Sequence, residues 1–385
     1  MIYLDYNATA PVRAEAAAAV ARALTLTGNA SSVHRAGRAA RAAIDQARDS
    51  VAALVGADPS QVVFTSGGTE ANNLALGVAG GRTVLASTIE HASVLAAVPQ
   101  ALGLAVTGDG VIDLDAALAA IAGANDLALV SVMLANNETG AIQPIGDIAR
   151  AAHAVGALVH CDAVQAAGKI AIDMPALGID MMTLSAHKLG GPQGVGALIV
   201  AAHVALTPIL AGGGQERRRR AGTENLPGIA GFGAAAAVAA RALEDASRIA
   251  GLRDRFERGV IAIAPDARIH ASGVARLPNT SLVGMPGVPA ETQVIALDLA
   301  GVAVSAGAAC SSGKVETSHV LLAMGLDPVV AREAIRVSFG WASSDRDLDG
   351  ALAAWEGFYR RTRPGSTGQR AGAKSGSPIG LETRW

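Results

Sequence analysis

Thr183-Leu184-Ser185-Ala186-His187-Lys188-Leu189-Gly190-Gly191-Pro192 follows an apolar run that begins at Ile179 and is typical of a short buried strand. The closing Gly-Gly-Pro predicts a turn at which backbone can approach a ligand closely. A lysine at the end of a buried strand is partly desolvated, which lowers its pKa and frees the amine as a nucleophile. Lys188 could therefore bind an aldehyde cofactor covalently. The alternative is a solvated lysine on a loop.

Apolar segments with the length of strands alternate with helical segments through the first two thirds of the chain. The expected strands are 62–65, 83–86, 127–134, 157–161, 181–184 and 196–200. The expected helices between most of them are 91–101, 114–121 and 145–155. This alternation favours an α/β fold with a mostly parallel sheet that is covered on both faces.

The length of 385 residues is enough for two domains. We expect a large domain over residues 13–258, closed by one or two long helices over 227–258. From residue 264, short strands, among them 302–305, mix with helices, which predicts a smaller α+β domain made of 259–362 and 1–12. Residues 363–385 are rich in Pro, Gly and Ser and have no periodicity, so we expect a disordered tail.

Composition limits the function classes. The net charge of -2 argues against nucleic acid as the main partner. Two cysteines give no disulfide framework and fit a reducing compartment. The first residues show no basic region before an apolar one, and the Ala-rich run 229–240 is too short to cross a bilayer. We therefore expect a cytoplasmic protein without a membrane partner.

A glycine turn follows the expected strand 62–65. Its sequence is Ser66-Gly67-Gly68-Thr69-Glu70, and a helix is expected from Ala71. A turn between a strand and a helix presents backbone N–H groups to an anion. We favour phosphate binding at Gly68 and Thr69 over a plain turn.

Several polar side chains follow the ends of expected strands, where ligands bind in parallel sheets. Asp162 could pair with a pyridinium nitrogen or could cap the next helix. His91 could lie flat on an aromatic ring, move protons, or be structural. Asn137 lies in an Asn-Asn-Glu-Thr-Gly turn, which is a weak signal by itself.

Cys310 lies in a segment of small residues, Ser305 to Lys314, that offers nothing to bury a side chain. An exposed cysteine in an intracellular protein is typically a nucleophilic thiolate, and Lys314 could lower its pKa. Cys161, inside an apolar strand, is expected to be inert. Arg336 lies in a strand pattern and either faces solvent or binds a carboxylate. The run Arg217 to Arg220 indicates a nearby anion or a solvated loop.

Taken together, these motifs resemble the cysteine desulfurases, which are class V, fold-type I pyridoxal-phosphate enzymes. The resemblance implies that the mostly parallel sheet of the large domain has seven strands. The resemblance extends from about residue 2 to residue 360 and rests on motifs in the same order: 3–9, 64–73, 136–140, 185–188 and 220–225. The Cys310 segment, with Ser318-His319-Val320-Leu321, is most similar to the nitrogenase-associated, NifS-like branch.

The resemblance implies a role for each matched position. Lys188 would hold pyridoxal 5'-phosphate covalently and later transfer protons. Asp162 would pair with the pyridine nitrogen, His91 would stack on the ring, and Gln165 would bond its phenolic oxygen. Thr223 would reach the phosphate from the other subunit of a homodimer. The remaining implied contacts are to the phosphate by Gly68, Thr69, Ser185 and His187, to the cofactor and substrate by Asn137, and to the substrate carboxylate by Arg336.

The implied activity removes sulfur from L-cysteine, giving L-alanine and a persulfide on Cys310. An iron–sulfur scaffold protein would receive the sulfur, and Cys310 could ligate a nascent cluster together with that partner. No catalytic metal is expected. The alternatives are a selenocysteine lyase, a class V aminotransferase, which would not need Cys310, and a non-catalytic sulfur-relay subunit. The acceptor stays open between nitrogenase-specific assembly, general assembly and tRNA thiolation.

Overall fold

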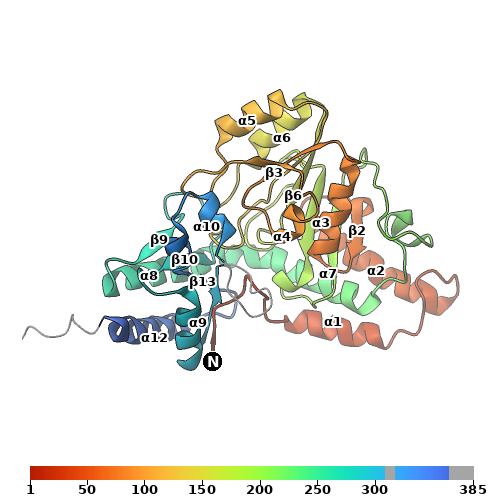
Figure 1. Cartoon of the computed structure of the whole chain (residues 1–385). Coiled ribbons are helices and arrows are strands. Elements are labelled where there is room, and N and C mark those ends of the chain that lie inside the picture. Colours follow the sequence, from red (N-terminus) through yellow and green to blue (C-terminus); the bar gives the residue numbers. More distant parts are fainter. Residues whose placement is uncertain (308–316, 364–385) are drawn as a thin grey trace, which may run out of the picture.

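The protein was analysed as a computed structural model, which describes residues 1–307 and 317–363. Its centre is a seven-stranded sheet in which β8 alone runs antiparallel to its neighbours β2 and β7 (Figure 1). The expectation of a mostly parallel sheet is confirmed. In spatial order, the strands are β2 (Val62–Thr65), β8 (Gly196–Val200), β7 (Met181–Ser185), β6 (Leu158–Asp162), β5 (Leu127–Ser131), β3 (Thr83–Ser87) and β4 (Leu102–Leu104).

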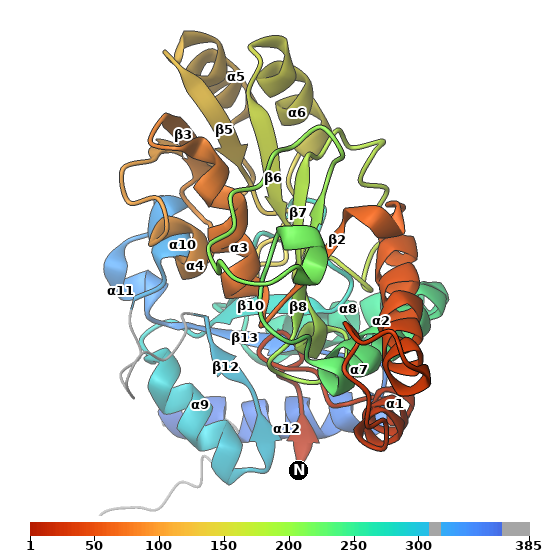
Figure 2. The same cartoon turned by 90° about the vertical axis from the view of Figure 1, so that its right-hand side faces the viewer.

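Helices cover both faces of this sheet, which explains why its central strands are buried at every residue and mostly apolar. One face packs on α1 (Ala14–Leu24), α2 (Arg35–Leu54), α5 (Leu114–Gly123), α6 (Ile145–Ala154) and α7 (Leu226–Arg241). The other face packs on α3 (Gly68–Leu76) and α4 (Ala92–Leu95). The result is a three-layer arrangement (Figure 2). Because β3, β5, β6 and β7 run parallel to one another, their carboxyl ends lie at the same edge of the sheet.

A second group of elements forms its own core beside the sheet. Its four-stranded antiparallel sheet has the order β12 (Ser305–Ala306), β13 (Ala334–Ser338), β10 (Thr280–Gly284) and β9 (Arg268–His270). The helices α8 (Ala246–Ile263), α9 (Ala290–Leu299) and α12 (Asp345–Thr362) pack around it. The N-terminal strand β1 (Ile2–Tyr3) joins this group by pairing with β11 (Val302–Ala303). The short helices α10 (His319–Ala323) and α11 (Pro328–Ala331) lie between the two groups.

The helical run Leu226–Ile263, which joins α7 and α8 through a 3-10 turn, is by length and composition apolar enough to cross a membrane. Both halves nevertheless have protein partners. α7 packs against α1 and α2, and buried residues of α8 belong to the same core as α12. Burial within the fold therefore accounts for part of the apolar composition of this run, since 44% of its most apolar window is buried.

Two local expectations were wrong. The helix expected over 91–101 is only the single turn Ala92–Leu95, and β4 begins at Leu102. The strand expected over 302–305 is divided, because β11 pairs with β1 and β12 pairs with β13. The domain boundaries stay a prediction. The tail 364–385 and Cys310 lie outside the described residues.

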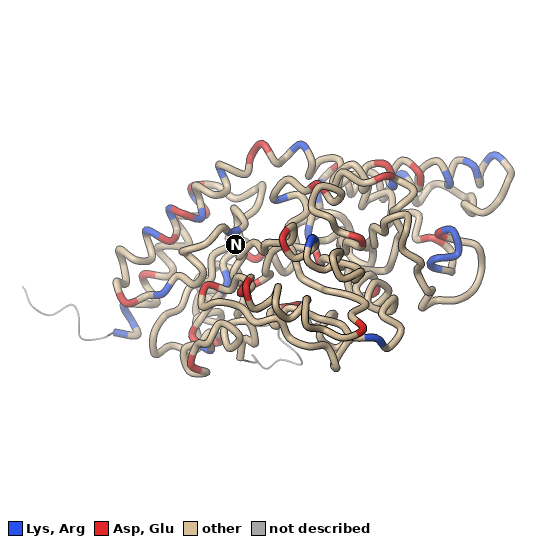
Figure 3. The backbone as a smooth tube through the Cα atoms, turned by 90° about the horizontal axis from the view of Figure 1, so that it is seen from above, with Lys and Arg blue, Asp and Glu red and all other residues tan. Residues whose placement is uncertain are grey.

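The basic run after β8 begins with a left-handed turn. Glu216, Arg217 and Arg218 all have positive φ, which is strained for residues with side chains. Glu216 offsets this strain because its buried carboxylate accepts two hydrogen bonds from Arg48, at 2.8 and 2.9 Å, and one from the Phe64 N–H. Elsewhere, acidic and basic residues are intermixed along the backbone (Figure 3). Nothing in the structure explains Arg218.

Candidate active site

A cavity of about 470 Å³ opens where the strands of the large sheet end. This volume lies within the range of ~300–1,000 Å³ that is typical of small-molecule sites. The structure brings most of the expected site residues to this one cavity. The lining includes Gly68, Thr69, His91, Asn137, Asp162, Gln165, Ser185, His187, Lys188 and Arg336.

Lys188 follows β7 and ends a single 3-10 turn, Ala186–Lys188. Its Nζ donates hydrogen bonds to the backbone carbonyls of Asn7 and Ala8, both at 2.7 Å. Burial, and secondly the positive charge of Arg336, lower the pKa of Lys188 to about 8. At a pKa of about 8, roughly a tenth of the amine is uncharged at pH 7, far more than for a lysine with the ordinary pKa, and the uncharged amine is the nucleophilic form.

Asp162 ends β6, and two donors fix its carboxylate. Oδ2 accepts from the side-chain amide of Asn72 at 2.8 Å, and Oδ1 accepts from the Val164 N–H at 3.0 Å. Asn72, on α3, also donates to Ser93. Asn72 is not among the site residues expected from the sequence, although it lies one helical turn after the glycine turn. The carboxylate is thus oriented, buried and able to face a cationic ring nitrogen.

His91 is the N-cap of α4. Its Nδ1 accepts from the Ser93 N–H at 3.1 Å, which fixes the plane of the imidazole. Burial is the main cause that lowers the pKa of His91 below its ordinary value, so the ring is neutral at neutral pH. The ring lines the cavity and is positioned to stack on a flat ligand.

The N-terminus of α3 forms the anion end of the cavity. A Cβ on Gly68 would lie 3.2 Å from Val164 Cγ2 and 3.6 Å from Ser185 Cβ, so glycine keeps this space open. The first N–H groups of the helix and its positive end favour a phosphate. His187 lies nearby in the cavity, and burial together with Lys188 lowers its pKa to about 4.

Arg336, on β13, reaches the same cavity from the smaller sheet. Its Nη1 donates to the Asn137 carbonyl at 2.9 Å and its Nη2 to Asp5 at 3.0 Å. Two buried polar atoms here have no partner in the described part of the chain, Arg336 Nε and Asn137 Oδ1. Such atoms are costly unless a ligand satisfies them. Arg336 therefore retains the capacity to bind a carboxylate.

Asn7 and Lys169 are site residues that the sequence analysis missed. The Gln165 amide donates to the Asn7 carbonyl at 3.0 Å and accepts from Lys169 Nζ at 2.7 Å. Asn7 is 1% exposed, and its backbone carbonyl is the one that accepts from Lys188. The sequence signal that could have indicated Asn7 is its position in the motif 3–9. For Lys169, only its spacing of four residues from Gln165 could have indicated the contact.

Two expected site residues, Thr223 and Cys310, are not placed in this cavity, and Cys161 is not reactive. Thr223 is exposed and lines a separate hollow of about 230 Å³ with Ser66 and Arg220, outside the main cavity of its own chain. Cys310 lies outside the described residues, and the chain leading to it lines the cavity at Ser305 and Gly307. Burial raises the pKa of the Cys161 thiol well above its usual value, so this thiol is inert.

The donor set fits pyridoxal phosphate. The cavity combines an amine nucleophile, a buried carboxylate, a flat imidazole and the start of a helix, and it holds unpaired polar atoms for a further ligand. No group of three or more His, Cys, Asp or Glu side chains suited to a metal ion occurs within residues 1–307 and 317–363. The residues present thus suit an organic phosphate cofactor.

Comparisons with known proteins agree with this chemistry. The family model described as Aminotransferase class-V matches residues 2–350. A cysteine desulfurase from Cereibacter sphaeroides is 44% identical over 366 residues, covering 91% of this chain and 94% of the relative. Cysteine desulfurase 2 from Trichormus variabilis is 41% identical over 376 residues, covering 94% of each. The solved structure of a NifS-like protein from Rickettsia africae matches with a TM-score of 0.87 and 35% identity, covering 93% of this chain and 99% of that one.

Proposed function

Since this chain belongs to the class-V aminotransferase family and is a cysteine desulfurase of its pyridoxal-phosphate-dependent kind, we propose that it transfers the sulfur of L-cysteine to Cys310 and releases L-alanine. The observation that carries the proposal is the amine of Lys188, whose pKa is lowered to about 8. It lies in one cavity with Asp162, His91 and Arg336.

The cofactor would be held by groups around the cavity. The start of α3 at Gly68 and Thr69, with Ser185 and His187, would bind the phosphate. Asp162 would face the ring nitrogen, His91 would stack on the ring, and Gln165 would bond the phenolic oxygen. When bound, pyridoxal phosphate supplies an electron sink for the negative charge that develops at Cα of the substrate.

The chain's own groups would then position the substrate and move its protons. Arg336, with Asn137, would bind the carboxylate of L-cysteine and fix the direction of its Cα–H bond. Lys188 Nζ would accept the Cα proton, because an amine with a pKa near ambient pH is efficient as both base and acid. His91, neutral because its pKa is lowered, would exclude water from one face of the site.

Sulfur transfer would require Cys310 as a thiolate. A bond forms between its Sγ and the sulfur of L-cysteine, and the Cβ–S bond of the substrate breaks. The electron pair of that bond goes to the carbon fragment, which becomes alanine after protonation. The product on the enzyme is a cysteine persulfide, a reversible form that can pass sulfur onward.

We further propose a cytoplasmic homodimer in which Thr223 reaches the partner's phosphate site. The acceptor we propose is an iron–sulfur scaffold protein, which could be specific for nitrogenase assembly. The position of Ser305 and Gly307 at the cavity supports an encounter between Cys310 and substrate, because this stretch leads directly into the Cys310 segment.

The test is a sulfide and alanine assay on the purified wild type, Cys310→Ala and Lys188→Ala in the presence of L-cysteine and a reductant. We expect a yellow wild type that forms sulfide and alanine in equal amounts. Cys310→Ala should keep the visible absorbance and lose sulfide release, whereas Lys188→Ala should lose both. A colourless wild type, or undiminished release by Cys310→Ala, would contradict the proposal.

The same assay separates the alternatives. A selenocysteine lyase would release selenide from selenocysteine and almost no sulfide from L-cysteine. A class V aminotransferase would transfer the amino group to a 2-oxo acid, and its rate would not depend on Cys310. A non-catalytic relay subunit would be colourless and inactive with every substrate.

A further inference from the structure

Lysine is rare in this chain, and the described lysines lie in one place. The sequence has four lysines against 27 arginines. In residues 1–307 and 317–363, the lysines are Lys169 and Lys188, and hydrogen bonds to Asn7 connect both. The proposed chemistry uses Lys188 and gives Lys169 no role. A second amine so close to the reactive one requires a physical explanation.

The amine of Lys169 is bound by two amide oxygens. Nζ donates to Gln165 Oε1 at 2.7 Å and to Asn7 Oδ1 at 2.8 Å. No ion pair of Lys169 occurs within the part of the chain that the structure describes. Burial is the main cause that lowers the pKa of Lys169 well below its usual value. The amine can donate both hydrogen bonds whether or not it carries the extra proton.

The first contact determines which way the Gln165 amide points. An amide has a donor end and an acceptor end, and its environment decides between the two orientations. Lys169 Nζ donates to Oε1, and the Asn7 carbonyl, which can only accept, lies against Nε2, so the two contacts hold the amide in the same orientation. Nε2 therefore faces the Asn7 carbonyl, at 3.0 Å, and the cavity. Gln165 thus presents a donor to a ligand in the cavity.

The second contact fixes Asn7. Its Oδ1 accepts from Lys169 and from Asn279 Nδ2, the latter at 3.0 Å. Its backbone carbonyl then accepts from both Gln165 and Lys188, at 3.0 and 2.7 Å. A chain of hydrogen bonds thus leads from Lys169 through Gln165 and Asn7 to the reactive amine. Such networks act as a unit, and their members cannot be evaluated one at a time.

We propose that Lys169 is a positioning residue of the active site, which holds the Gln165 amide with its donor toward the phenolic oxygen of the cofactor and holds Asn7 against Lys188. The inference rests on the proposed function, because it takes the phenolic oxygen as the partner of Gln165. Lys169 touches neither the substrate nor the reacting atoms, so it acts through Gln165 and Asn7.

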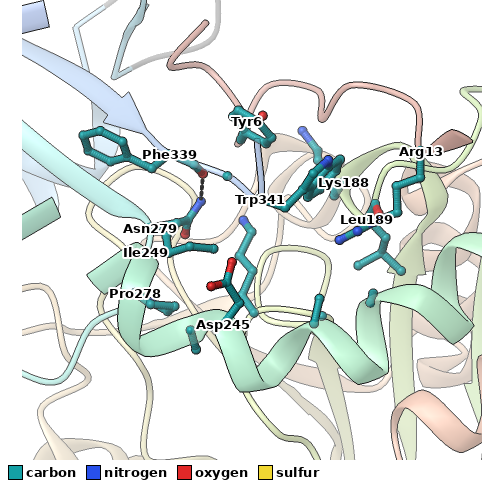
Figure 4. A pocket seen from close by; sticks show the side chains of 16 residues that line it. Tyr6, Arg13, Lys188, Leu189, Asp245, Ile249, Pro278, Asn279, Phe339 and Trp341 are labelled. Atoms are coloured by element: carbon teal, nitrogen blue, oxygen red, sulfur yellow. Dashed lines mark hydrogen bonds between the residues drawn. The ribbon is translucent and has the colours of Figure 1, made fainter. Parts of the chain in front are cut away.

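A second cavity makes a rescue experiment possible. A small hollow of about 40 Å³ is lined by both Lys169 and Lys188. Tyr6, Trp341 and Asp245 enclose the same space (Figure 4). This hollow offers room for a guanidinium group, which is larger than an amine and keeps its donors. Lys169→Arg therefore tests whether donors at this place are sufficient, whereas Lys169→Met keeps the length and removes them.

The experiment is a pH titration of the visible absorbance of the cofactor-loaded, full-length protein. It reports the proton held at Lys188 Nζ beside the phenolic oxygen. A donor to that oxygen stabilises its negative charge and makes the neighbouring proton easier to lose. Lys169→Met should therefore raise the pH of the transition by about one unit, which is the size of one hydrogen bond to a charged group. The transition of Lys169→Arg should lie within about 0.3 pH unit of the wild-type transition, which is a small part of the shift expected for Lys169→Met.

A double-mutant cycle decides whether Lys169 acts through Gln165. Gln165→Ala alone should raise the pH of the absorbance transition. In the Gln165→Ala background, Lys169→Met should shift this pH by less than half of the shift that Lys169→Met causes in the wild-type background. An unchanged transition in Lys169→Met would overturn the inference. Full additivity of the two substitutions would overturn it too, because Lys169 would then act independently of Gln165.

The thermal midpoint of each variant serves as the folding control, since a purely structural role would lower the midpoint and leave the transition unmoved. That outcome also overturns the inference. If the wild type itself has no visible band, the proposed cofactor site has failed. If the wild type has the band and Lys169→Met titrates identically, only the role of Lys169 has failed.

Discussion

The chemistry of Lys188 depends on what surrounds one amine. Backbone carbonyls of Asn7 and Ala8 accept from Nζ, but carbonyls carry no full negative charge to stabilise an ammonium. The nearest strong influences are burial and the like charge of Arg336, and both lower the pKa. The carboxylates of Asp5 and Asp162 oppose them without reversing the direction. The net result is an amine whose pKa, about 8, is close to neutral pH.

This balance predicts the reactivity of Lys188 in the cofactor-free protein. Acylation by a lysine-directed reagent, followed by peptide mass spectrometry, should be half-maximal near pH 8, because the pKa is lowered to about 8 from 10.5. The unfolded chain binds more protons than the folded one between these two values, so the folded state gains stability as the pH rises through that window. Arg336→Met removes the like charge and should raise the midpoint. A midpoint near that of a free lysine would contradict the pKa.

Some site residues could be predicted because their signals are local. Asp162, His91 and Lys188 each follow an apolar run, and strand ends converge at one edge of a parallel sheet. Asn7 and Lys169 could not be found in this way. Their hydrogen bonds to Gln165 and to each other join the first residues of the chain to β6 and the turn that follows it. Only the folded backbone brings such segments together.

At the scale of elements, strands buried on both faces could be predicted well, because most residues in them are apolar. The prediction of a helix over 91–101 was wrong for two reasons. Pro99 disfavours a helix at the preceding residue. Gly103 lets β4 approach β3, since a Cβ there would lie 2.8 Å from Thr88 Cγ2. The second reason depends on a contact between strands, which a helical pattern cannot reveal.

Helix packing gives a prediction with an internal control. A Cβ on Gly233 of α7 would lie 2.4 Å from Ala47 Cα of α2, so Gly233→Ala must force the two helices apart. We expect a loss of unfolding free energy of about 1–3 kcal/mol, the usual cost of overpacking. Gly251→Ala, on the exposed face of α8, meets nothing within 4 Å. It should stabilise the protein by about 0.5–1 kcal/mol, because alanine is favoured over glycine inside a helix.

Denaturant unfolding of both variants beside the wild type measures this contrast. The two substitutions add the same methyl group to a helix, so any difference between them comes from packing. Equal effects of Gly233→Ala and Gly251→Ala would show that the contact between α7 and α2 relaxes without cost.

At the scale of the whole molecule, the site lies where two cores meet. The large sheet supplies Asp162 and Lys188, and the smaller sheet supplies Arg336. The N-terminal segment joins them, because the Asn7 side chain donates to the Asn137 carbonyl and to Thr280 on β10. The position and the pKa of the Lys188 amine therefore depend on how the two cores pack against each other. Periodicity could predict each group of elements, whereas their junction depends on tertiary contacts.

The hollow around Thr223 leads to the last prediction, on the proposed homodimer. Thr223 lies outside the main cavity of its own chain, so any contact with a cofactor phosphate must be made in a partner subunit. Thr223→Val should weaken cofactor binding, and Lys188→Ala should abolish activity. A heterodimer of these two chains would contain one complete site, because the Lys188→Ala chain supplies Thr223 to the chain that keeps Lys188.

Differently tagged variants, co-expressed and purified through both tags, provide that heterodimer. At limiting cofactor, its sulfide release should exceed that of either parent and approach half of the wild-type value, since one of two sites is intact. The matched control puts both substitutions on one chain and pairs it with a wild-type chain. There, the chain that keeps Lys188 receives a valine from its partner, so cofactor affinity should be low. If the two arrangements were equally active, Thr223 would serve no site, and if the control were the more active one, Thr223 would serve its own chain.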